Sequence, residues 1–412
     1  MPLHELHLYC QVVDNFGDAG VCWRLARQLA REHGLSVTLW IDQPPVLRRL
    51  VPELELAPPL SGRQPAPANP GLTVRAWPAD APPGPHAALP DVVVCAFGCE
   101  PPAWLRAQLA HAPPRPLWIN LEYLSAEPWV EGCHGLASIK PADGAREHFF
   151  YPGWREATGG LLRERDLLAS RDAFRRSSAA ERWWQARGLD GLIGRRVSVF
   201  CYPQAPLQAL LSAMAQSAEP TLALVSEGIG AAVIDALAAA WPTEETPAGP
   251  TLSRPSAGAL AAARCGGSAR LRRIGQLTLV PLPMLPIDDY DRLLWSCDLN
   301  FVRGEDSWVR ALWAGRPLIW QPYRQTDDAH RVKLEAFLDW QREGLGGPAT
   351  PGLAALEQLS RDWSAGIDPG PAWQSLQEPL AHLGTGFDRL AATQGSATDL
   401  ASKLVEFCRS RL

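Results

Sequence analysis

The sequence has no long apolar run, no basic cluster and no paired-cysteine motif, and each of these absences excludes a class of protein. Its most apolar stretch, Gly228–Trp241, is interrupted by Asp235 and falls short of the roughly 20 residues that a membrane-spanning helix needs. The formal net charge of −5 is small and comes without the basic patch that binds nucleic acid. The sequence therefore predicts no membrane partner and no nucleic-acid partner.

The nine cysteines lack the arrangement that a metal knuckle or a disulfide framework needs. They are scattered, odd in number and contain no CxxC pair. Met1–Leu8 has neither the basic start nor the apolar centre of a secretion signal. Together these features predict a cytoplasmic chain with reduced thiols.

The length and the apolar content of the chain favour two domains. A chain of 412 residues is long for one hydrophobic core, and its 46% apolar and 20% charged residues are typical of a globular protein. Four apolar runs in the first half predict strands: Leu6–Val13, Ser36–Ile41, Asp91–Phe97 and Leu117–Leu121. After the first run, Val21, Leu25 and Leu29 recur at helical spacing. This alternation of strand and helix is typical of a parallel, doubly wound sheet.

The second half repeats the alternation from about Arg195 onwards. Its predicted strands are Val197–Tyr202, Thr221–Val225, Leu277–Leu282, Leu299–Val302 and Leu318–Trp320, and its first predicted helices are Leu207–Ala215 and Ala231–Ala240. Pro58–Pro90 and Thr246–Ser268 are rich in proline, glycine or alanine and are predicted to be loops or insertions. We therefore predict an α/β fold of GT-B type, with two Rossmann-like domains facing a central cleft. The domains are placed at 1–190 and 191–389, with a C-terminal helix at about 390–412 packing back on the first.

The first of two polar turns follows the first strand and reads Asp14-Asn15-Phe16-Gly17-Asp18. Ligands in such folds bind at the carboxyl ends of the strands. Two carboxylates four residues apart across a strand-to-helix turn can converge, and close carboxylates push their pKa values apart, which suits a base and a helper. Alternatively, Asp18 only caps the following helix, as aspartate often does. Asp14, at the end of a strand, has no such structural role.

The second polar turn, Arg303-Gly304-Glu305-Asp306-Ser307, joins an apolar strand to a helix. A helix amino end with Arg303 beside it would suit a diphosphate, and Ser307 would cap the helix. Glu305 and Asp306 suit sugar or ribose hydroxyls, because a carboxylate accepts from hydroxyls but repels phosphate. A capped surface helix with an internal Arg–Glu pair is the alternative interpretation. Tyr202 and Tyr323, at the ends of two other predicted strands, are either core residues or nucleotide contacts.

Three weaker patterns do not amount to a cofactor or metal site. Gly228-Ile229-Gly230 resembles half of a dinucleotide fingerprint but has Val233 at its third small position. Asp289-Tyr290-Asp291 matches the DxD of metal-dependent sugar transferases but lies where a helix begins, and acids are favoured there by the helix dipole. Asp327, Asp328 and His330 have no matching second cluster. We expect no metal and no resident cofactor.

Two longer stretches, VVDNFGDAGVCWRLARQLA and LNFVRGEDSWVRALWAGRPLIWQPY, resemble the elongation factor P arginine rhamnosyltransferase family. INLEYLSAEPWVEGCHGL and FFYPGWREATGGLLRE lie between them and add to the match. The resemblance implies a GT-B fold, a dTDP-β-L-rhamnose donor and metal-independent inversion at the anomeric carbon. It also implies that the acceptor is one arginine of translation elongation factor P. Because the carboxylate pair is in the first domain and the phosphate-compatible helix end is in the second, we predict that the first domain binds the acceptor and the second binds the nucleotide sugar.

The same resemblance assigns site residues. Asp14, Asp18 and Glu305 fall on the family's three essential acids, with Asp18 favoured over Asp14 as the general base. The positions assigned to the donor are Asn15, Phe16, Gly17, Tyr202, Met284, Ile287, Arg303, Gly304, Asp306, Ser307 and Tyr323. At two of them the chain departs from the family, which leads us to expect phenylalanine at 284 and glutamine at 287. Met284 can still pack against a thymine ring, whereas Ile287 offers the base only backbone groups.

Two other functions fit the same residues. One is a nucleotide-sugar-dependent glycosyltransferase with a glycan or lipid acceptor, and the lack of a membrane helix weighs against the lipid. The other is a non-catalytic nucleotide-sugar-binding partner of a translation factor. The presence of all three acids weighs against that alternative, because binding alone requires no base.

Overall fold

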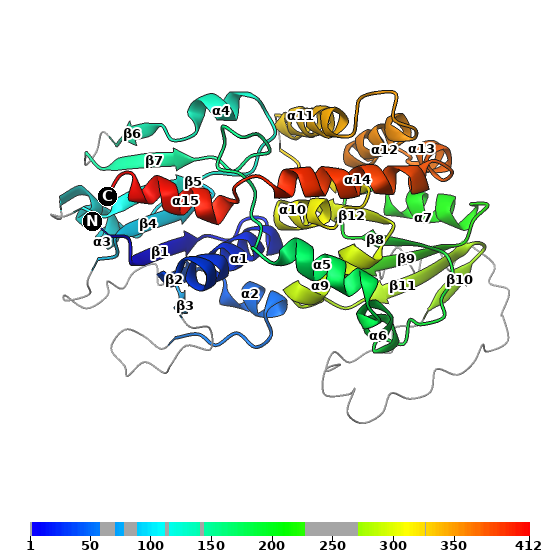
Figure 1. Cartoon of the computed structure of the whole chain (residues 1–412), viewed down its shortest axis with the longest axis horizontal. Helices are drawn as coiled ribbons and strands as arrows, with labels where there is room; N and C mark the ends of the chain where they lie inside the picture. Colours follow the sequence, from blue (N-terminus) through cyan, green and yellow to red (C-terminus); the bar gives the residue numbers. More distant parts are fainter. Residues whose placement is uncertain are drawn as a thin grey trace. The chain divides into compact units, whose positions relative to one another are not determined.

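A computed structural model describes residues 2–57, 71–77, 89–111, 115–140, 144–226, 271–325 and 327–412. The chain divides into two compact units (Figure 1). The first unit comprises Met1–Arg165, Glu335–Trp340 and Thr393–Leu412, and the second comprises Asp166–Leu334 and Gln341–Ala392. Each unit is built on its own mainly parallel sheet, which confirms the predicted pair of Rossmann-like folds.

The sheet of the first unit has the strand order β3-β2-β1-β4-β5-β7-β6 among the described residues. Its strands are β1 (Glu5–Cys10), β2 (Ser36–Ile41), β3 (Leu72–Ala76), β4 (Val92–Ala96), β5 (Leu117–Leu121), β6 (Ala137–Ile139) and β7 (Arg146–Phe150). Only the short edge strand β6 runs antiparallel to its neighbour. The central strand β4 is wholly apolar and buried, and the second half of β1, residues 8–10, is buried as well, as a sheet covered on both faces requires.

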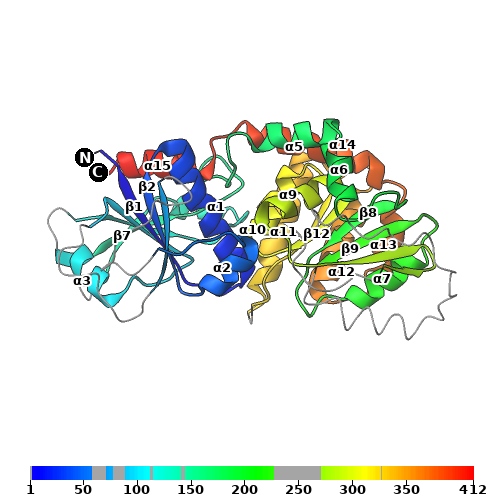
Figure 2. The same cartoon turned by 90° about the horizontal axis from the view of Figure 1, so that it is seen from below.

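The helices of the first unit are α1 (Phe16–His33), α2 (Pro44–Leu50), α3 (Ala103–His111), α4 (Trp129–Cys133) and α15 (Leu400–Arg409). Helix α1 ends at Gly34, whose left-handed backbone (φ 67°) lets its N–H bond to the carbonyl of Leu29. Helix α15 packs on α1 (Figure 1 and Figure 2). Gln28 of α1 donates to the Asp399 carboxylate at 3.0 Å, and Asp399 also caps α15 by accepting from the Ser402 N–H.

The sheet of the second unit has the order β10-β11-β9-β8-β12-β13. Its strands are β8 (Arg195–Val199), β9 (Thr221–Ser226), β10 (Arg272–Ile274), β11 (Leu277–Leu282), β12 (Leu299–Arg303) and β13 (Leu318–Gln321). The helices that lie wholly or mainly in this unit are α5 (Leu167–Arg176), α6 (Ala179–Gln185), α7 (Leu207–Ala215), α9 (Ile287–Ser296), α10 (Asp306–Trp313), α11 (Ala329–Gly344), α12 (Leu353–Ala365), α13 (Gly370–Leu376) and α14 (Leu380–Gly395). None of the helices in the described ranges has both the length and the apolarity needed to cross a membrane.

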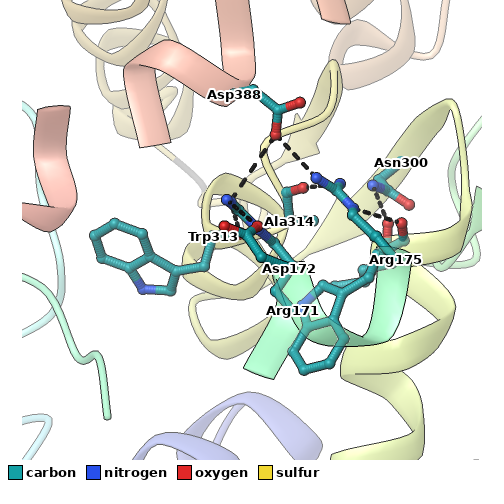
Figure 3. Close-up of polar contacts among 9 residues, drawn as sticks. Arg171, Asp172, Arg175, Asn300, Trp313, Ala314 and Asp388 are labelled. Atoms are coloured by element: carbon teal, nitrogen blue, oxygen red, sulfur yellow. Dashed lines mark hydrogen bonds and ion pairs between the residues drawn. The ribbon is translucent and has the colours of Figure 1, made fainter. Parts of the chain in front are cut away.

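The chain passes from the first unit to the second between Arg165 and Asp166, so helices α5 and α6 lie in the second unit although they precede residue 190. Figure 3 shows why α5 belongs there: two of its arginines are bonded to the end of α10. Arg171 donates to the Trp313 carbonyl at 2.9 Å and Arg175 donates to the Ala314 carbonyl. Arg175 also pairs with Asp388 of α14 at 2.9 Å. These partners lie more than a hundred positions apart, so the pattern of nearby residues could not reveal them.

Other sequence predictions need correction or fall outside the described residues. The segment Pro58–Pro90, predicted as a loop, contains β3, which pairs in parallel with β2. This strand was not predicted because it is only five residues long and lies between proline-rich stretches of sequence. Strands β6, β7 and β10 were not predicted, because all three are short and β7 and β10 carry charged residues. The helix predicted at Ala231–Ala240, the glycine pattern at 228–230 and the insertion Thr246–Ser268 lie outside the described residues.

Candidate functional site

Each sheet has one point at which the chain order reverses, and each polar turn lies at one of them. In the first unit the chain runs from β1 outward through β2, and returns to the other side of β1 with β4. In the second unit the same reversal separates β8 from β12. Open α/β sheets leave a crevice for ligands outside the carboxyl ends of the strands at such a point. Residues 14–18 follow β1 and residues 303–307 end or follow β12, so both turns lie at the position where such sheets bind ligands.

Asp18 is buried, with 3% of its surface exposed, and lies in the first turn of α1. Its Oδ2 atom accepts hydrogen bonds from the backbone N–H groups of Val13, at 2.8 Å, and Asp14, at 2.7 Å. Both donors precede the helix, so Asp18 does not cap α1 in the ordinary sense but holds the loop that enters it. The structure therefore links Asp14 and Asp18 through the Asp14 backbone; the convergence of their two carboxylates stays a prediction.

The loop before α1 is held in an unusual backbone conformation. Asn15, the N-cap residue of α1, has φ 46° and ψ −106°, which is costly for a residue other than glycine. The Gly17 N–H bonds to the Asp14 carbonyl at 2.9 Å, and the Val12 N–H bonds to the Asp42 carboxylate at 2.9 Å. Backbone strain of this kind persists only where the surrounding contacts enforce it, as they do here.

Burial raises the pKa of the Asp18 carboxyl above its ordinary value of 3.8. The two backbone N–H groups oppose this shift because they stabilise the anion, while the nearby Asp42 charge adds to it. A carboxylate with a raised pKa binds a proton more readily. Asp18 therefore has the environment of a general base.

In the second unit, the turn from β12 to α10 is made by Gly304, whose backbone is left-handed (φ 61°). The N-cap residue of α10 is Glu305, not Ser307 as the sequence analysis predicted. Ser307 instead lies in the first turn of the helix and bonds back to the strand end. Its hydroxyl oxygen accepts from the Arg303 N–H at 3.1 Å, and the hydroxyl donates to the Arg303 carbonyl. The helix begins earlier than expected because the glycine turns the chain sharply.

The side chain of Arg303 lies over two aromatic rings that follow β8. Its guanidinium carbon is 4.5 Å from the centre of the Phe200 ring and 4.4 Å from that of Tyr202. Tyr202 is in turn in edge-to-face contact with Tyr323, with ring centres 5.7 Å apart. Tyr202 is buried, whereas Tyr323 is 53% exposed. The structure thus brings together three residues that the sequence analysis assigned to the donor: Tyr202, Arg303 and Tyr323.

Two further residues support this cluster and were missed from the sequence. Phe200 provides the second ring beneath Arg303, and its only sequence signal was its place at a strand end, two residues before Tyr202. Gln321, the last residue of β13, accepts from the Tyr202 N–H at 2.8 Å through its side-chain oxygen. Buried hydrogen bonds of this kind fix the backbone of a site, but a glutamine in a strand gives no sign of it.

Met284 and Ile287 lie between β11 and the first turn of α9. Met284 is half-buried in the connection, and Ile287 is the first residue of the helix. The Ile287 side chain is buried, with 5% exposed. The expectation that residue 287 offers a base only its backbone stays a prediction.

The DxD-like acids are engaged in ion pairs. Asp289 pairs with Arg187 and with Arg292, each at 2.8 Å. Asp291 accepts two hydrogen bonds from the buried Arg310, at 3.0 and 2.6 Å. In the described part of the chain, no three histidine, cysteine or acidic side chains come together as a metal site would require.

Three comparisons with known proteins agree. The family model of the elongation factor P (EF-P) rhamnosyltransferase EarP matches residues 6–409. A protein-arginine rhamnosyltransferase of Pseudomonas putida is 42% identical over 407 residues, which is 98% of each chain. Another, of Shewanella oneidensis, is 36% identical over 420 residues and covers 98% of this chain and 97% of its own. A solved structure, described as the structural basis for EarP-mediated arginine glycosylation of translation elongation factor EF-P, is 30% identical with a TM-score of 0.62 over 99% of both chains.

The solved structure also bears on the class of fold. The similarity to this solved structure extends over both units of the chain rather than over one of them. Together with the two mainly parallel sheets, this likeness confirms the predicted α/β fold of GT-B type.

Proposed function

Because the chain belongs to the elongation factor P rhamnosyltransferase family, we propose that it transfers rhamnose to an arginine side chain of translation elongation factor P. Membership makes the chain a glycosyltransferase, with relatives of 34–42% identity named protein-arginine rhamnosyltransferases. The observation that most supports an arginine acceptor is the buried carboxylate of Asp18, at the point of the first sheet where the chain order reverses. We propose that the first unit binds the acceptor arginine and the second unit binds dTDP-β-L-rhamnose.

In the proposed reaction, a guanidinium nitrogen of the acceptor forms a bond to the anomeric carbon of rhamnose. The bond from that carbon to the diphosphate oxygen breaks, and dTDP leaves. Attack from the face opposite the leaving group inverts the anomeric configuration. Because a guanidinium stays protonated near neutral pH, one of its protons has to be removed as the new bond forms. Asp18 takes this proton, and Asp14 orients the guanidinium by hydrogen bonds.

The second unit supplies the groups that a departing diphosphate needs. The amino end of α10 offers backbone N–H groups and partial positive charge, and Arg303 adds a full charge next to it. The rings of Phe200 and Tyr202 hold the Arg303 side chain beside this helix end. Glu305 and Asp306, at the start of the helix, accept hydrogen bonds from sugar hydroxyls. Met284 and the backbone at Ile287 contact the base, and we assign Tyr323 to the nucleotide as well.

The proposed function is tested by incubating the purified protein with elongation factor P and dTDP-rhamnose, and then measuring the mass of the intact acceptor. We expect a gain of one deoxyhexosyl residue, and no gain when the acceptor arginine is replaced with alanine. A gain in the alanine acceptor would refute transfer to that arginine. Donor binding without transfer to either acceptor would instead support a nucleotide-sugar-binding partner.

A second prediction concerns metal ions. Treating the enzyme with a chelator is expected to leave its transfer rate unchanged, because Arg303 and the amino end of α10 neutralise the leaving diphosphate. The rate is measured before and after removal of the chelator, with and without added Mg²⁺ or Mn²⁺. If the chelator abolished transfer and either ion restored it, the proposed role of Arg303 and the helix end would be wrong.

A further inference from the structure

A pair of stacked aromatic rings lies at the same edge of the first sheet as Asp18. Phe97 follows β4 and Tyr123 follows β5, and their ring centres are 4.8 Å apart with the ring planes inclined by only 22°. Strand β4 lies between β1 and β5, so the pair is next to the strand end from which residues 14–18 continue. Neighbouring strands are about 4.8 Å apart, which places Tyr123 about 10 Å from the end of β1.

The backbone of Phe97 is left-handed, with φ 60°, and Gly98 after it has φ 71°. A bulky residue other than glycine rarely adopts this conformation, and it does so at a cost. The Phe97 N–H nevertheless bonds to the Leu121 carbonyl at 2.7 Å, so the pairing of β4 with β5 continues through the strained residue. The fold thus places a phenylalanine in a backbone conformation that glycine adopts at a lower conformational energy. The phenylalanine ring lies against Tyr123.

Acidic side chains lie on both sides of this pair. Asp14 and Asp18 follow β1, and Glu122 follows β5. The Glu122 carboxylate accepts from the Asn120 amide at 3.0 Å. Burial first, and then the charge of Glu122, raise the pKa of Tyr151, the residue after β7, to about 12. The edge therefore combines flat aromatic surface with negative charge.

This combination suits a guanidinium group. Guanidinium is planar, weakly hydrated and always charged, so it stacks on aromatic faces and binds carboxylates through paired hydrogen bonds. Resting on the proposed function, we propose that Tyr123, backed by Phe97, is the surface on which the acceptor arginine lies while its guanidinium reaches Asp18. Tyr123 is then a positioning residue: it orients the arginine, and the carboxylates of residues 14 and 18 do the chemistry.

The test is a double-mutant cycle on binding, measured by calorimetry with the whole enzyme and elongation factor P. The enzyme change is Tyr123→Leu, and the acceptor change replaces the modified arginine with alanine. Stacking of a cation on an aromatic ring changes affinity by about 2- to 30-fold, so Tyr123→Leu should weaken binding of the arginine acceptor by that factor. Binding of the alanine acceptor should be the same for both enzymes. Equal weakening for the two acceptors would overturn the proposal, because Tyr123 would then not contact the arginine.

Tyr123→Phe is the matched variant, since it keeps the ring and removes only the hydroxyl. It should bind the arginine acceptor as the wild type does, and in transfer assays the KM for acceptor should rise in Tyr123→Leu while donor affinity is unchanged. If Tyr123→Phe lost as much acceptor affinity as Tyr123→Leu, stacking would not be the role of the ring. Failure of the wild-type enzyme itself to transfer rhamnose to elongation factor P would count against the proposed function. A wild type that transfers, with an additive cycle, would count against this inference alone.

Discussion

Replacing Asp18 with asparagine is expected to lower the transfer rate by about 10²–10⁴-fold while the fold and the donor affinity stay intact. Asparagine has the same shape, and its carbonyl oxygen can accept the N–H groups of Val13 and Asp14 that Asp18 Oδ2 now accepts. It cannot take a proton, so only the chemical step should suffer. The measurements are turnover, donor affinity and melting temperature of the variant.

Asp42, which follows β2 and binds the same loop, provides a matched control. Its carboxylate also accepts a backbone N–H, that of Val12 at 2.9 Å, but we assign it no part in the reaction. Asp42→Asn should therefore keep near-normal turnover. If Asp18→Asn did so too, the base would be Asp14, and Asp18 would only hold the loop. Asp14→Asn should lose activity in part if Asp14 orients the guanidinium.

The raised pKa of Asp18 also sets the direction of a pH effect. A general base must be ionised, so the acidic limb of the kcat/KM profile should lie above the ordinary aspartate value of 3.8. The charge of Asp42 contributes to the increase, so Asp42→Asn should move this limb to lower pH.

The raised pKa of Asp18 also affects how the folding stability depends on pH, and this dependence has the opposite sign to that of a salt-bridged aspartate. Because the pKa of Asp18 is higher in the folded state than in the unfolded state, its stabilising contribution is present below the unfolded-state pKa. That contribution is lost as the pH rises through the folded-state pKa. Neutral asparagine should thus cost no stability near pH 7.

Replacing Asp291 with alanine is expected to destabilise the second unit by about 3–5 kcal/mol. Asp291 and Arg310 are 4% and 2% exposed, and they are joined by two hydrogen bonds of 2.6 and 3.0 Å. Removing the carboxylate takes these two hydrogen bonds and their charge away from a buried guanidinium, which costs far more than the net value of the pair. The free energy of unfolding in denaturant, followed by a probe in the second unit, is the measurement.

Two comparisons sharpen this experiment. Asp289→Ala removes a partly exposed carboxylate from its ion pairs with Arg187 and Arg292 and should cost only about 1 kcal/mol or less. Replacing both members of the buried pair with apolar residues, Asp291→Leu with Arg310→Met, should restore much of the lost stability. If Asp291→Ala left stability unchanged but made transfer depend on added metal, the DxD interpretation of residues 289–291 would return.

The pair also connects stability to the donor site. Asp291 lies on α9 and Arg310 on α10, and these helices begin next to the residues that we assign to the base and to the diphosphate. Loosening the contact between them should weaken donor binding as well. Asp18→Asn, in the other unit, should leave donor binding unchanged, so the two variants separate a structural from a chemical defect.

Much of this protein could be predicted from local patterns in its sequence. Buried parallel strands such as β1, β4, β9 and β12 are rich in apolar residues, because both of their faces are covered. The polar residues directly after two of them had to lie at the carboxyl edge of a sheet. That reasoning located both turns, and the family motifs then assigned Asp18 and Arg303 their roles. Strands β3, β6 and β10 were not predicted because a short edge strand depends on its neighbour for its conformation.

The tertiary structure decided what each polar side chain contacts. Asp18 was predicted as a base or a helix cap, and the structure shows that its buried carboxylate holds the preceding loop by accepting the N–H groups of Val13 and Asp14. It is therefore not an ordinary cap, and its role as the base stays a prediction. Asp291 matched a metal motif but is bound to Arg310. Phe97 has a left-handed backbone, and its ring lies against that of Tyr123. Such partners come from other elements of the fold. Periodicity in a sequence determines which face of an element is buried, but only the packing of whole elements determines which distant side chain a charge or a ring meets.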